Sequence, residues 1–436
     1  MIRKYFFVVL SLILFTFNAD ATNYTSAANG NWMNPFTWTP IGVPIPGDNV
    51  TISHVVTLDT SFAYTSGTIS VLGSLINDSF GRDIWLNGPS AQFSSSGIVT
   101  LRSILISSGS FVNSGVLNVK RVANFGYLTN NSLMQGVDSL YNDGEFSNND
   151  NLRIMTFFND SILKNYGTIQ GLTTVVDSMY NNGTFTNFSN GLIKADSATN
   201  NGLFTNNGAI EWLQFTNYIN GVFTNNNALS FDDMTNMGNF TNNGSIVGAV
   251  SMWNNEVFNN TSTGTITLSV SFLNADSLSN TASFNNDGSF DIGDSFYNFN
   301  TITGSSTGSF TMQDTSYNSG SMTGAFDFCD ATPPPSYPYI DFNLGTIAPT
   351  ITYCLGTFVS NTETSSKFAL YPNPTKGNIY FGKTNQFVEV YDVLGQQIVK
   401  DYTNQINLNG YNKGVYFVVI KDKEGFQLFK EKLIKD

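Results

Sequence analysis

A nine-residue phrase that occurs twice in succession constrains this chain more than any other feature. The copies are Asp-Ser-Met-Tyr-Asn-Asn-Gly-Thr-Phe and Asp-Ser-Ala-Thr-Asn-Asn-Gly-Leu-Phe, beginning at Asp177 and Asp196. Related copies extend from Ser103 to Met322, mostly in steps of 16 to 20 residues, with two longer steps of 23 and 26 that indicate inserted loops. A period near 20 residues is typical of a solenoid, in which each repeat buries its apolar face by stacking on its neighbours.

Three positions of the phrase carry structural information. Position nine is large and apolar and predicts an interior column: Phe111, Leu128, Phe146, Ile169, Phe185, Phe204, Phe223, Phe240, Phe258, Phe284, Ile302 and Met322. Position seven is usually Gly, which suits a corner that needs positive φ or close backbone approach. Position five is usually Asn, whose amide can bond to the same amide in the next coil and form a ladder: Asn124, Asn142, Asn165, Asn181, Asn200, Asn236, Asn254, Asn280, Asn298 and Asn318.

We therefore expect an all-β chain, with a parallel β-solenoid (β-helix) over residues 76–328 followed by a small antiparallel β-sandwich. A second half-phrase, as in residues 205–210 and 241–246, supplies another strand and corner, so that each coil has about three faces. About 13 coils at roughly 4.8 Å each predict a rod about 60 Å long.

Composition excludes several classes of partner and catalytic site. Only 12% of residues are charged and the net charge is -13, which argues against nucleic acid as a partner because phosphate contacts need clustered Lys and Arg. His54 is the single histidine, which removes Ser-His-Asp triads and His-rich metal sites from consideration. We predict no cofactor.

The N-terminal segments indicate export. Residues 1–21 combine Arg3 and Lys4, a short apolar run and an Ala-x-Ala site, the pattern of a secretory signal peptide. Residues 22–75 contain Trp32, Trp38 and a Pro-Gly-Asp turn leading into alternating apolar residues. This segment resembles the start of the domain named for its eight glycines, which often heads extracellular β-helices. We expect it to cap the first coil, with the tryptophans and His54 in packing roles.

Position four of the phrase is the candidate binding feature. It is aromatic at Tyr141, Tyr180, Tyr218, Trp253, Tyr297 and Tyr317. Rings that point outward would form a broken stripe able to stack on the sugar units of extracellular glycans, whereas inward rings would only pack in the core. Both orientations are open from the sequence.

A recurring Asp-Ser-apolar tripeptide suggests modification. It resembles the O-glycosylation sequon of exported Bacteroidetes proteins, and the resemblance marks these acceptors: Ser139, Ser161, Ser178, Ser197 and Ser277. The same residues also belong to the structural repeat, so a purely structural role is the alternative.

Catalytic and metal sites are weakly indicated. Asp232 and Asp233 are adjacent carboxylates, but strand neighbours point to opposite faces and would not converge on one bond. Stacked Asp276, Asp294 and Asp314 are the candidate calcium ligands. We predict no catalytic residues and no metal site.

The C-terminal part divides into a cap and a second domain. Cys329 and Cys354 form an even pair in an exported chain, which favours a disulfide within a cap and linker over residues 329–366. Residues 367–436 resemble the type A C-terminal sorting domain of type IX secretion, through strand motifs that include Tyr371, Pro372, Asn373, Pro374, Gly414 and Lys432. The resemblance implies a Bacteroidetes-type source, contact with the type IX secretion machinery, and either attachment to surface lipopolysaccharide or release.

The sequence thus predicts a secreted or cell-surface structural and adhesive β-solenoid. The alternative is a carbohydrate-active enzyme, a polysaccharide lyase or hydrolase on a β-helix scaffold. A passive glycosylated component of a surface layer is the third hypothesis.

Overall fold

The structure is a computed structural model that describes residues 21–172, 175–275, 281–334, 337–354, 370–381, 386–393, 396–421 and 427–436. It divides into two compact units, Met1–Thr357 and Phe358–Asp436, each with a hydrophobic core of its own. Residues 1–20 of the predicted signal peptide lie outside the described residues. Within the described part, no helix is long and apolar enough to cross a membrane.

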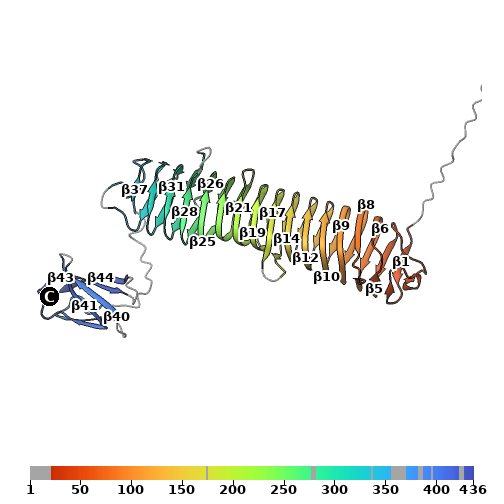
Figure 1. The fold of residues 1–436 in the computed structure, drawn as a ribbon, viewed down its shortest axis with the longest axis horizontal. Helices are drawn as coiled ribbons and strands as arrows, with labels where there is room; N and C mark the ends of the chain where they lie inside the picture. The colour runs from red at the N-terminus through yellow and green to blue at the C-terminus, as the bar shows by residue number, and fades with distance from the viewer. Residues whose placement is uncertain are drawn as a thin grey trace, which may run out of the picture. The chain divides into compact units, whose positions relative to one another are not determined.

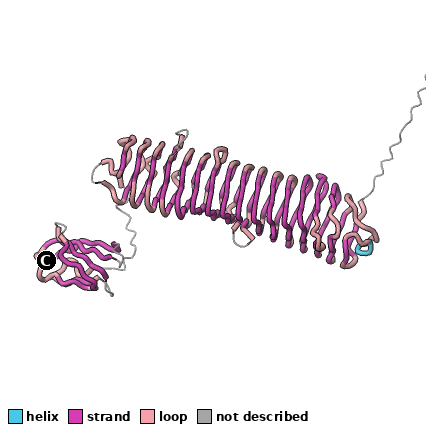
Figure 2. The backbone as a smooth tube through the Cα atoms, in the orientation of Figure 1, coloured by secondary structure: helices cyan, strands magenta, loops and turns pink. Residues whose placement is uncertain are grey.

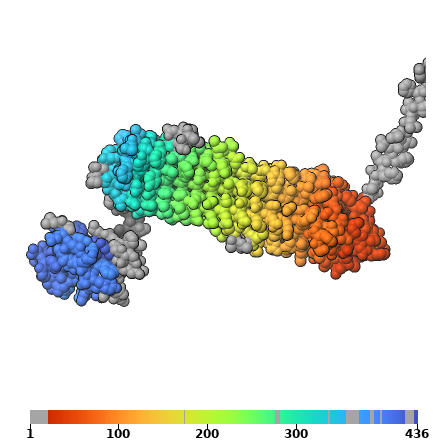
Figure 3. Space-filling model, viewed as in Figure 1, coloured from red at the N-terminus to blue at the C-terminus, as the bar shows by residue number. Residues whose placement is uncertain are grey.

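The first unit is a parallel β-solenoid of about 14 turns, as the repeat predicts. Figure 1 shows its strands stacked as rungs from β1 to β37, and Figure 2 shows loops at the corners between them. In the space-filling view this unit is a continuous elongated body (Figure 3). Its first elements are β1 (Asn23–Ser26), β2 (Gly30–Asn31), η1 (Pro35–Thr37), β3 (Trp38–Thr39), β4 (Asn49–Ile52), β5 (Val55–Leu58), β6 (Phe62–Val71) and β7 (Ser74–Asn77).

Short strands form one side of the rod, here named face one. They pair in parallel from turn to turn. These strands are β11 (Tyr127–Asn130), β13 (Glu145–Asn148), β15 (Ile162–Asn165), β18 (Thr184–Asn187), β20 (Leu203–Asn206), β22 (Val222–Asn225), β24 (Asn239–Asn242), β26 (Val257–Asn260), β29 (Ser283–Asn286), β32 (Thr301–Thr303), β35 (Ser321–Met322) and β38 (Thr346–Ile347).

Long strands supply the other two sides. In β19, Ile193 and Ala195 are buried and so are Ala198 and Asn200, so the inward alternation changes phase where the strand bends. The part before each bend forms face two and the part after it forms face three. These strands are β9 (Ile98–Asn113), β10 (Val116–Asn124), β12 (Leu133–Asn142), β14 (Asn151–Asn159), β19 (Leu192–Asn200), β21 (Ala209–Asn217), β23 (Ala228–Asn236) and β25 (Ser245–Asn254). β9 continues onto face one, and β8 (Asp83–Ser95) runs from face three onto face one.

In other turns the same two sides are separate strands, which confirms three faces per coil. The face-two strands are β16 (Thr168–Gln170), β27 (Thr265–Leu268), β30 (Ser289–Ile292), β33 (Ser309–Met312) and β36 (Asp327–Asp330). The face-three strands are β17 (Val176–Asn181), β28 (Ser271–Asn274), β31 (Phe296–Asn298), β34 (Ser316–Asn318) and β37 (Phe342–Asn343).

The predicted aromatic column is present inside face one. Phe185, Phe204 and Phe223 are register partners and fully buried. Their ring centroids are 4.4 Å apart between Phe185 and Phe204 and 4.9 Å apart between Phe204 and Phe223. Face one therefore contributes to the interior a continuous apolar column made of one ring or aliphatic group from each turn.

One turn was assigned in the wrong register. Leu163, not Ile169, stands in the column between Phe146 and Phe185, because Ser161 takes the corner place that Gly183 holds in the next turn. Ile169 instead pairs with Leu152 and Ile193 on face two. The error arises because both corners of a coil use the same Asn-x-Gly-x-apolar pattern.

Buried asparagines form two ladders along the rod. Position five supplies the first, and each Nδ2 donates to the Oδ1 of the next turn at 2.7 to 2.9 Å. Its members are Asn124, Asn142, Asn159, Asn181, Asn200, Asn217, Asn236, Asn254, Asn274, Asn298, Asn318 and Asn343. Asn165 was wrongly placed in this ladder, and Asn280 lies outside the described residues.

The half-phrase supplies a second ladder that the sequence analysis did not predict. Its members are Asn113, Asn130, Asn148, Asn165, Asn187, Asn206, Asn225, Asn242, Asn260 and Asn286. An amide is both donor and acceptor, so repeating it by simple translation satisfies each copy with the next one. Both ladders bond only when successive turns are in register.

The corner glycines have the two roles expected of position seven. A Cβ on Gly202 would lie 2.2 Å from the Gly183 carbonyl oxygen, so close backbone approach excludes a side chain there. Gly109 has φ +98°, which an L side chain rarely adopts.

The stack extends beyond residues 76–328 at both ends. β4 already pairs in parallel with β6, and β35 pairs with β38. Trp32 and Trp38 are buried in the first turns, with ring centroids 5.1 Å apart. His54 is exposed at the surface of the first turns, and its Nδ1 lies 3.0 Å from Ser26 Oγ. It is therefore a hydrogen-bonding surface residue and does not pack in the cap, which corrects the prediction from the sequence.

The second unit consists of two antiparallel sheets. One sheet has the order β41-β40-β43-β44 and the other pairs β39 with β42. The strands are β39 (Asn378–Tyr380), β40 (Gln386–Tyr391), β41 (Gln397–Thr403), β42 (Gln405–Asn407), β43 (Gly414–Lys421) and β44 (Gln427–Lys435). Ile379 and Ile406 from the smaller sheet share one core with Val388 and Val418 from the larger sheet.

Breaking the first ladder should destabilise the rod. In Asn200→Ala, the buried Oδ1 of Asn217 loses its donor, and an unsatisfied group of this kind costs about 1–3 kcal/mol. The Nδ2 of Asn181 loses its ladder partner but still donates to the Gly183 and Leu203 carbonyls. We expect a lower urea midpoint by circular dichroism. Asn226→Ala removes an exposed amide that bonds Asn207 and is the matched control, with an expected cost of about 0.5 kcal/mol or less. Equal losses in both variants would contradict the role of burial.

Candidate functional site

Five of the six position-four aromatics project outward from face three. Tyr141, Tyr180, Trp253, Tyr297 and Tyr317 each stand between inward residues, as Tyr141 does between buried Leu140 and Asn142. The register places all five in one column along the rod. This column is called the face-three column below.

The face-three column has two aromatic segments. In the first, Phe158 lies between Tyr141 and Tyr180, and its ring stacks on Tyr180 with centroids 4.8 Å apart. In the second, Trp253 is followed by Leu273, Tyr297, Tyr317 and Phe342 in successive turns. Tyr180 is 37% exposed, Trp253 42% and Phe342 60%. Phe158 and Phe342 were missed because they stand in turns where the phrase is least regular.

Threonines interrupt the aromatic rings of the face-three column. Thr199, Thr216 and Thr235 occupy the same column between Tyr180 and Trp253, so the rings do not form one contiguous strip. Trp253 is fixed in position because its indole Nε1 donates to the Ala275 carbonyl at 3.1 Å. The surface can therefore offer two rigid aromatic platforms separated by a hydroxyl-bearing stretch.

Tyr218 does not belong to the column. Its backbone N–H donates to the Asn200 carbonyl at the corner after face three, and Thr216 takes the column position. This corner runs from Asn217 to Gly221, two residues longer than the corresponding run from Asn200 to Gly202. Counting back from Gly221 therefore shifted the prediction by two residues.

The candidate glycosylation serines fall in different environments. Ser139, Ser178 and Ser197 share a half-buried column on face three, next to the aromatic one. Ser161 stands at a corner, and Ser277 lies outside the described residues. Modification of these serines stays a prediction.

The candidate carboxylates do not form a shared site. Asp233 accepts a hydrogen bond from Ser251 Oγ at 2.7 Å, whereas its neighbour Asp232 lines a surface groove. Asp294 and Asp314 are on successive turns, and Asp276 lies outside the described residues. No group of three or more His, Cys, Asp or Glu able to hold a metal ion occurs in the part of the chain that the structure describes.

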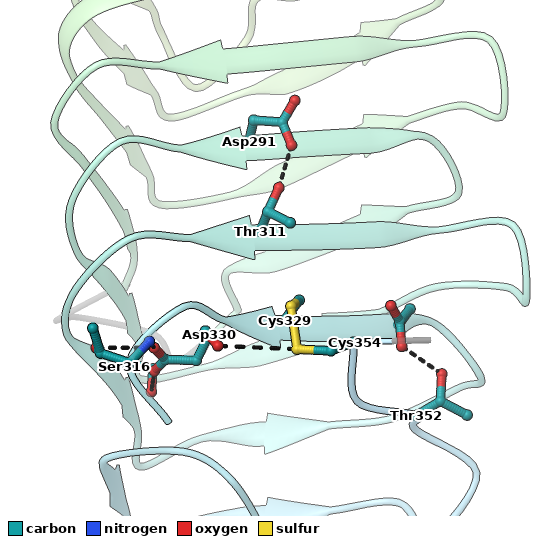
Figure 4. The surroundings of a disulfide bond; sticks show 9 residues. Asp291, Thr311, Ser316, Cys329, Asp330, Thr352 and Cys354 are labelled. Atoms are coloured by element: carbon teal, nitrogen blue, oxygen red, sulfur yellow. Dashed lines mark hydrogen bonds between the residues drawn. A yellow bond between two sulfur atoms is a disulfide. The ribbon is translucent and has the colours of Figure 1, made fainter. Parts of the chain in front are cut away.

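A disulfide holds the end of the stack, as predicted. Cys329 on β36 is bonded to Cys354, and Thr352 Oγ1 donates to Asp327 Oδ1 at 2.8 Å beside it (Figure 4). Ser316 Oγ donates to the buried Asp330 carboxylate at 2.5 Å in the same region. These contacts attach the segment after the last turns to the final coil.

Asn373 connects the sorting motif to the last strand. Its Nδ2 donates to the Lys432 carbonyl at 2.7 Å, and its Oδ1 accepts from the Ile434 N–H at 2.9 Å. Thr375 extends this contact, since its N–H donates to the Ile434 carbonyl at 2.8 Å. Tyr371 stacks on Tyr380 with centroids 5.8 Å apart. The predicted motif residues Tyr371, Asn373 and Lys432 thus lie near one edge formed with β44. Pro372 and Pro374 flank Asn373, and Gly414 begins β43.

Glu389 is a buried charged residue of the second unit. Lys421 Nζ lies 2.8 Å from its Oε2 and Lys400 Nζ 3.2 Å from its Oε1, and Tyr391 donates to Oε2 at 2.6 Å. Hydrogen bonds from Lys421 and then from Tyr391 lower the pKa of Glu389 to about 2, against the opposing effect of burial. Three strands are therefore joined by one carboxylate.

The fold defines a class of protein: a parallel β-solenoid with a small C-terminal β-domain. Residues 369–436 match the family model described as "Secretion system C-terminal sorting domain". No curated protein and no solved structure gives a significant match to the chain. The second unit is thus a type IX secretion sorting domain, which indicates contact with that secretion machinery and a surface or secreted location. Bacteroidetes origin and the signal peptide stay predictions.

Removal of the Asn373 amide should impair sorting. Asn373→Ala leaves a Lys432 carbonyl and an Ile434 N–H without their side-chain partner, so the edge along β44 loosens. We expect less solenoid outside the cell by immunoblot of surface and medium fractions. Asn412→Ala, at an exposed site in the same unit, is the control, and unchanged export of Asn373→Ala would contradict the prediction.

The Glu389 cluster should make the second unit acid-sensitive. A carboxyl whose folded pKa is below its unfolded value stabilises the fold above the unfolded value, and this stabilisation is lost as pH falls. The loss should run from about pH 4.5 to about pH 2. Urea unfolding of residues 358–436 would show it, and Glu389→Gln should flatten that part of the profile. An unchanged slope in the variant would refute the assignment.

Proposed function

We propose that this chain is a non-catalytic structural and adhesive rod outside the cell, which binds extended polysaccharide along face three. The observation that supports this proposal best is the outward column of aromatic side chains at regular turn spacing. The apolar face of an exposed aromatic ring can pack against the C–H face of a sugar. Since a stacked turn rises by roughly 4.8 Å, successive rings lie along the direction in which a polymer would extend.

Multivalency is the mechanism. Each platform holds only a few partly exposed rings, so a single contact is weak. Binding at Tyr180 brings the same polymer near Trp253 at a high effective concentration, and two weak sites combine into avidity. The Thr199, Thr216 and Thr235 hydroxyls between the platforms can bond to sugar hydroxyls along the way.

Low charge fits this role. Residues 195–354 contain no Lys or Arg, and the surface polar groups there are mainly amides, hydroxyls and carboxylates. Such a surface favours neutral hydroxyl-rich polymers over polyanions, because like charges repel. The sorting domain supports an extracellular setting for the contact.

A carbohydrate-active enzyme is the second candidate, and one feature favours it. Glu211 and Asp232 line the same groove, of about 320 Å³, at the corner between faces two and three. Two carboxylates that flank a bound sugar are the minimum for glycoside hydrolysis. Glu211, however, is already engaged in an ion pair, because Lys194 Nζ lies 2.6 Å from its Oε2.

Adsorption to insoluble cellulose, chitin and xylan tests the proposal. We expect binding to at least one polymer without release of soluble sugar. Loss of one ring in Tyr180→Ala or Trp253→Ala should weaken adsorption about two- to twelvefold, since an aromatic contact is worth about 0.5–1.5 kcal/mol.

Tyr127→Ala is the matched control, because Tyr127 is an exposed ring on face one. Release of sugar that disappears in Glu211→Gln would favour the enzyme. Absence of both adsorption and release would favour a passive surface-layer component.

A further inference from the structure

A second surface feature lies in the N-terminal turns of the rod and shares no residue with the two aromatic platforms. It is a groove of about 440 Å³ at the corner between faces two and three, where the loop 78–82 connects β7 to β8. Asn77, Phe80, Arg102, Asn118 and Lys120 are among its lining residues. Its surroundings differ from the rest of the solenoid in their positive charge.

Positive charge is concentrated here. Residues 22–354 contain seven Lys and Arg residues, and four of them fall between residues 82 and 121: Arg82, Arg102, Lys120 and Arg121. Strand register places Arg121 beside Ser103 and Ser103 beside Asp83, so the four occupy three successive turns. The remainder of the rod is dominated by carboxylates, so this corner is where an anion meets least repulsion.

Only part of this charge is neutralised. Arg82 pairs with Asp78, and Arg102 pairs with Asp83. The bonds from Arg102, and to a lesser extent from Ser103, hold the pKa of Asp83 below its usual range, so this pair carries no net charge at neutral pH. Lys120 is exposed and has no ion-pair partner among the residues that the structure describes. It is the lining cation left to bind an anion.

The groove also has an aromatic wall. Phe80 is 78% exposed, which is unusual for a phenylalanine on a hydrophilic rod. Its loop is held in place, because the Phe80 N–H donates to Asp78 Oδ1 at 3.0 Å and Arg82 Nε donates to Asp78 Oδ2 at 2.9 Å. The Arg82 guanidinium carbon lies 5.5 Å from the Phe80 ring centroid. A fixed, exposed ring beside cations is a recognition surface and not a core residue.

An unpaired acceptor completes the set. Asn77 Oδ1 is buried and has no hydrogen-bond partner in the described structure. Asn118, by contrast, is already engaged: it accepts from Gln135 Nε2 at 2.9 Å and donates to Thr100 Oγ1 at 3.3 Å. A buried acceptor without a partner is costly. Asn77 as a whole is half-buried in the groove lining, so a rotation of its side chain toward the groove would bring Oδ1 to a ligand hydroxyl.

We propose that this groove binds a single anionic sugar unit, one that carries a carboxylate or a sulfate group. Lys120 pairs with the anionic group, Asn77 Oδ1 accepts from a ring hydroxyl, and Phe80 packs against the C–H face of the sugar. A free inorganic anion would make only the contact with Lys120. A neutral sugar would make only the contacts with Asn77 and Phe80. The proposal is independent of polymer binding along face three, since the two surfaces share no residue.

Isothermal titration of the full chain with three trisaccharide-sized probes tests it. The probes are a galacturonate oligomer, a sulfated galactan oligomer and a neutral galactan oligomer. We expect one or both anionic probes to bind, with affinity that falls as salt rises through about 0.1 M, where charges separated by about 10 Å become screened. Lys120→Gln should weaken that binding about tenfold or more, as expected for loss of a charge-assisted contact.

Companion variants separate recognition from folding. Lys120→Arg keeps the charge and should restore most of the binding, and Phe80→Ala should weaken both anionic and neutral contacts. Lys194→Gln removes the same charge several turns away and should leave affinity unchanged. The proposal is overturned if neither anionic probe binds at millimolar concentration, if the neutral oligomer binds as well as they do, or if Lys194→Gln is as damaging as Lys120→Gln.

Discussion

The solenoid depends on the satisfaction of buried amides between successive turns. Asn200 and Asn206 are fully buried, and an amide taken out of water is unfavourable unless its donor and acceptor are both bonded. Here the partner of each amide is the equivalent asparagine in the next turn. All the amides are bonded only when every turn follows the same path as the previous one. The ladders therefore fix which residues pair between successive turns.

Hydrophobic burial and the ladders support each other. Phe204 lies two residues before Asn206 on one strand, so the ring column and the second ladder line the same interior face. Apolar packing alone would tolerate a slip of two residues along a strand, since it would only exchange one inward side chain for another. A slipped amide would lose both its neighbours. The rings supply most of the stabilisation, and the amides make one register unique.

The same register organises the outer surface. Because inward residues stack, their outward neighbours stack too, and a ring at Tyr297 falls beside a ring at Tyr317 without any selection for that contact alone. Variation is confined to the corners, where the longer run between Asn217 and Gly221 and the loop 78–82 are accommodated. The flat faces of the solenoid thus present side chains at a regular spacing, which suits a polymer. The corners differ from turn to turn, which suits a single local binding site.

Sequence alone determined the solenoid, its apolar column, the position-five ladder, the disulfide and the sorting domain, because each depends on a pattern repeated or spaced along the chain. It misplaced Ile169, because two corners with the same Asn and Gly chemistry cannot be told apart without their partners. It misplaced Tyr218, because the corner from Asn217 to Gly221 is two residues longer than the one before it. Only the tertiary structure decided that the position-four rings point outward. It alone also brought Asn77, Phe80 and Lys120 together, since residues on different turns become neighbours through the stacking of the whole coil.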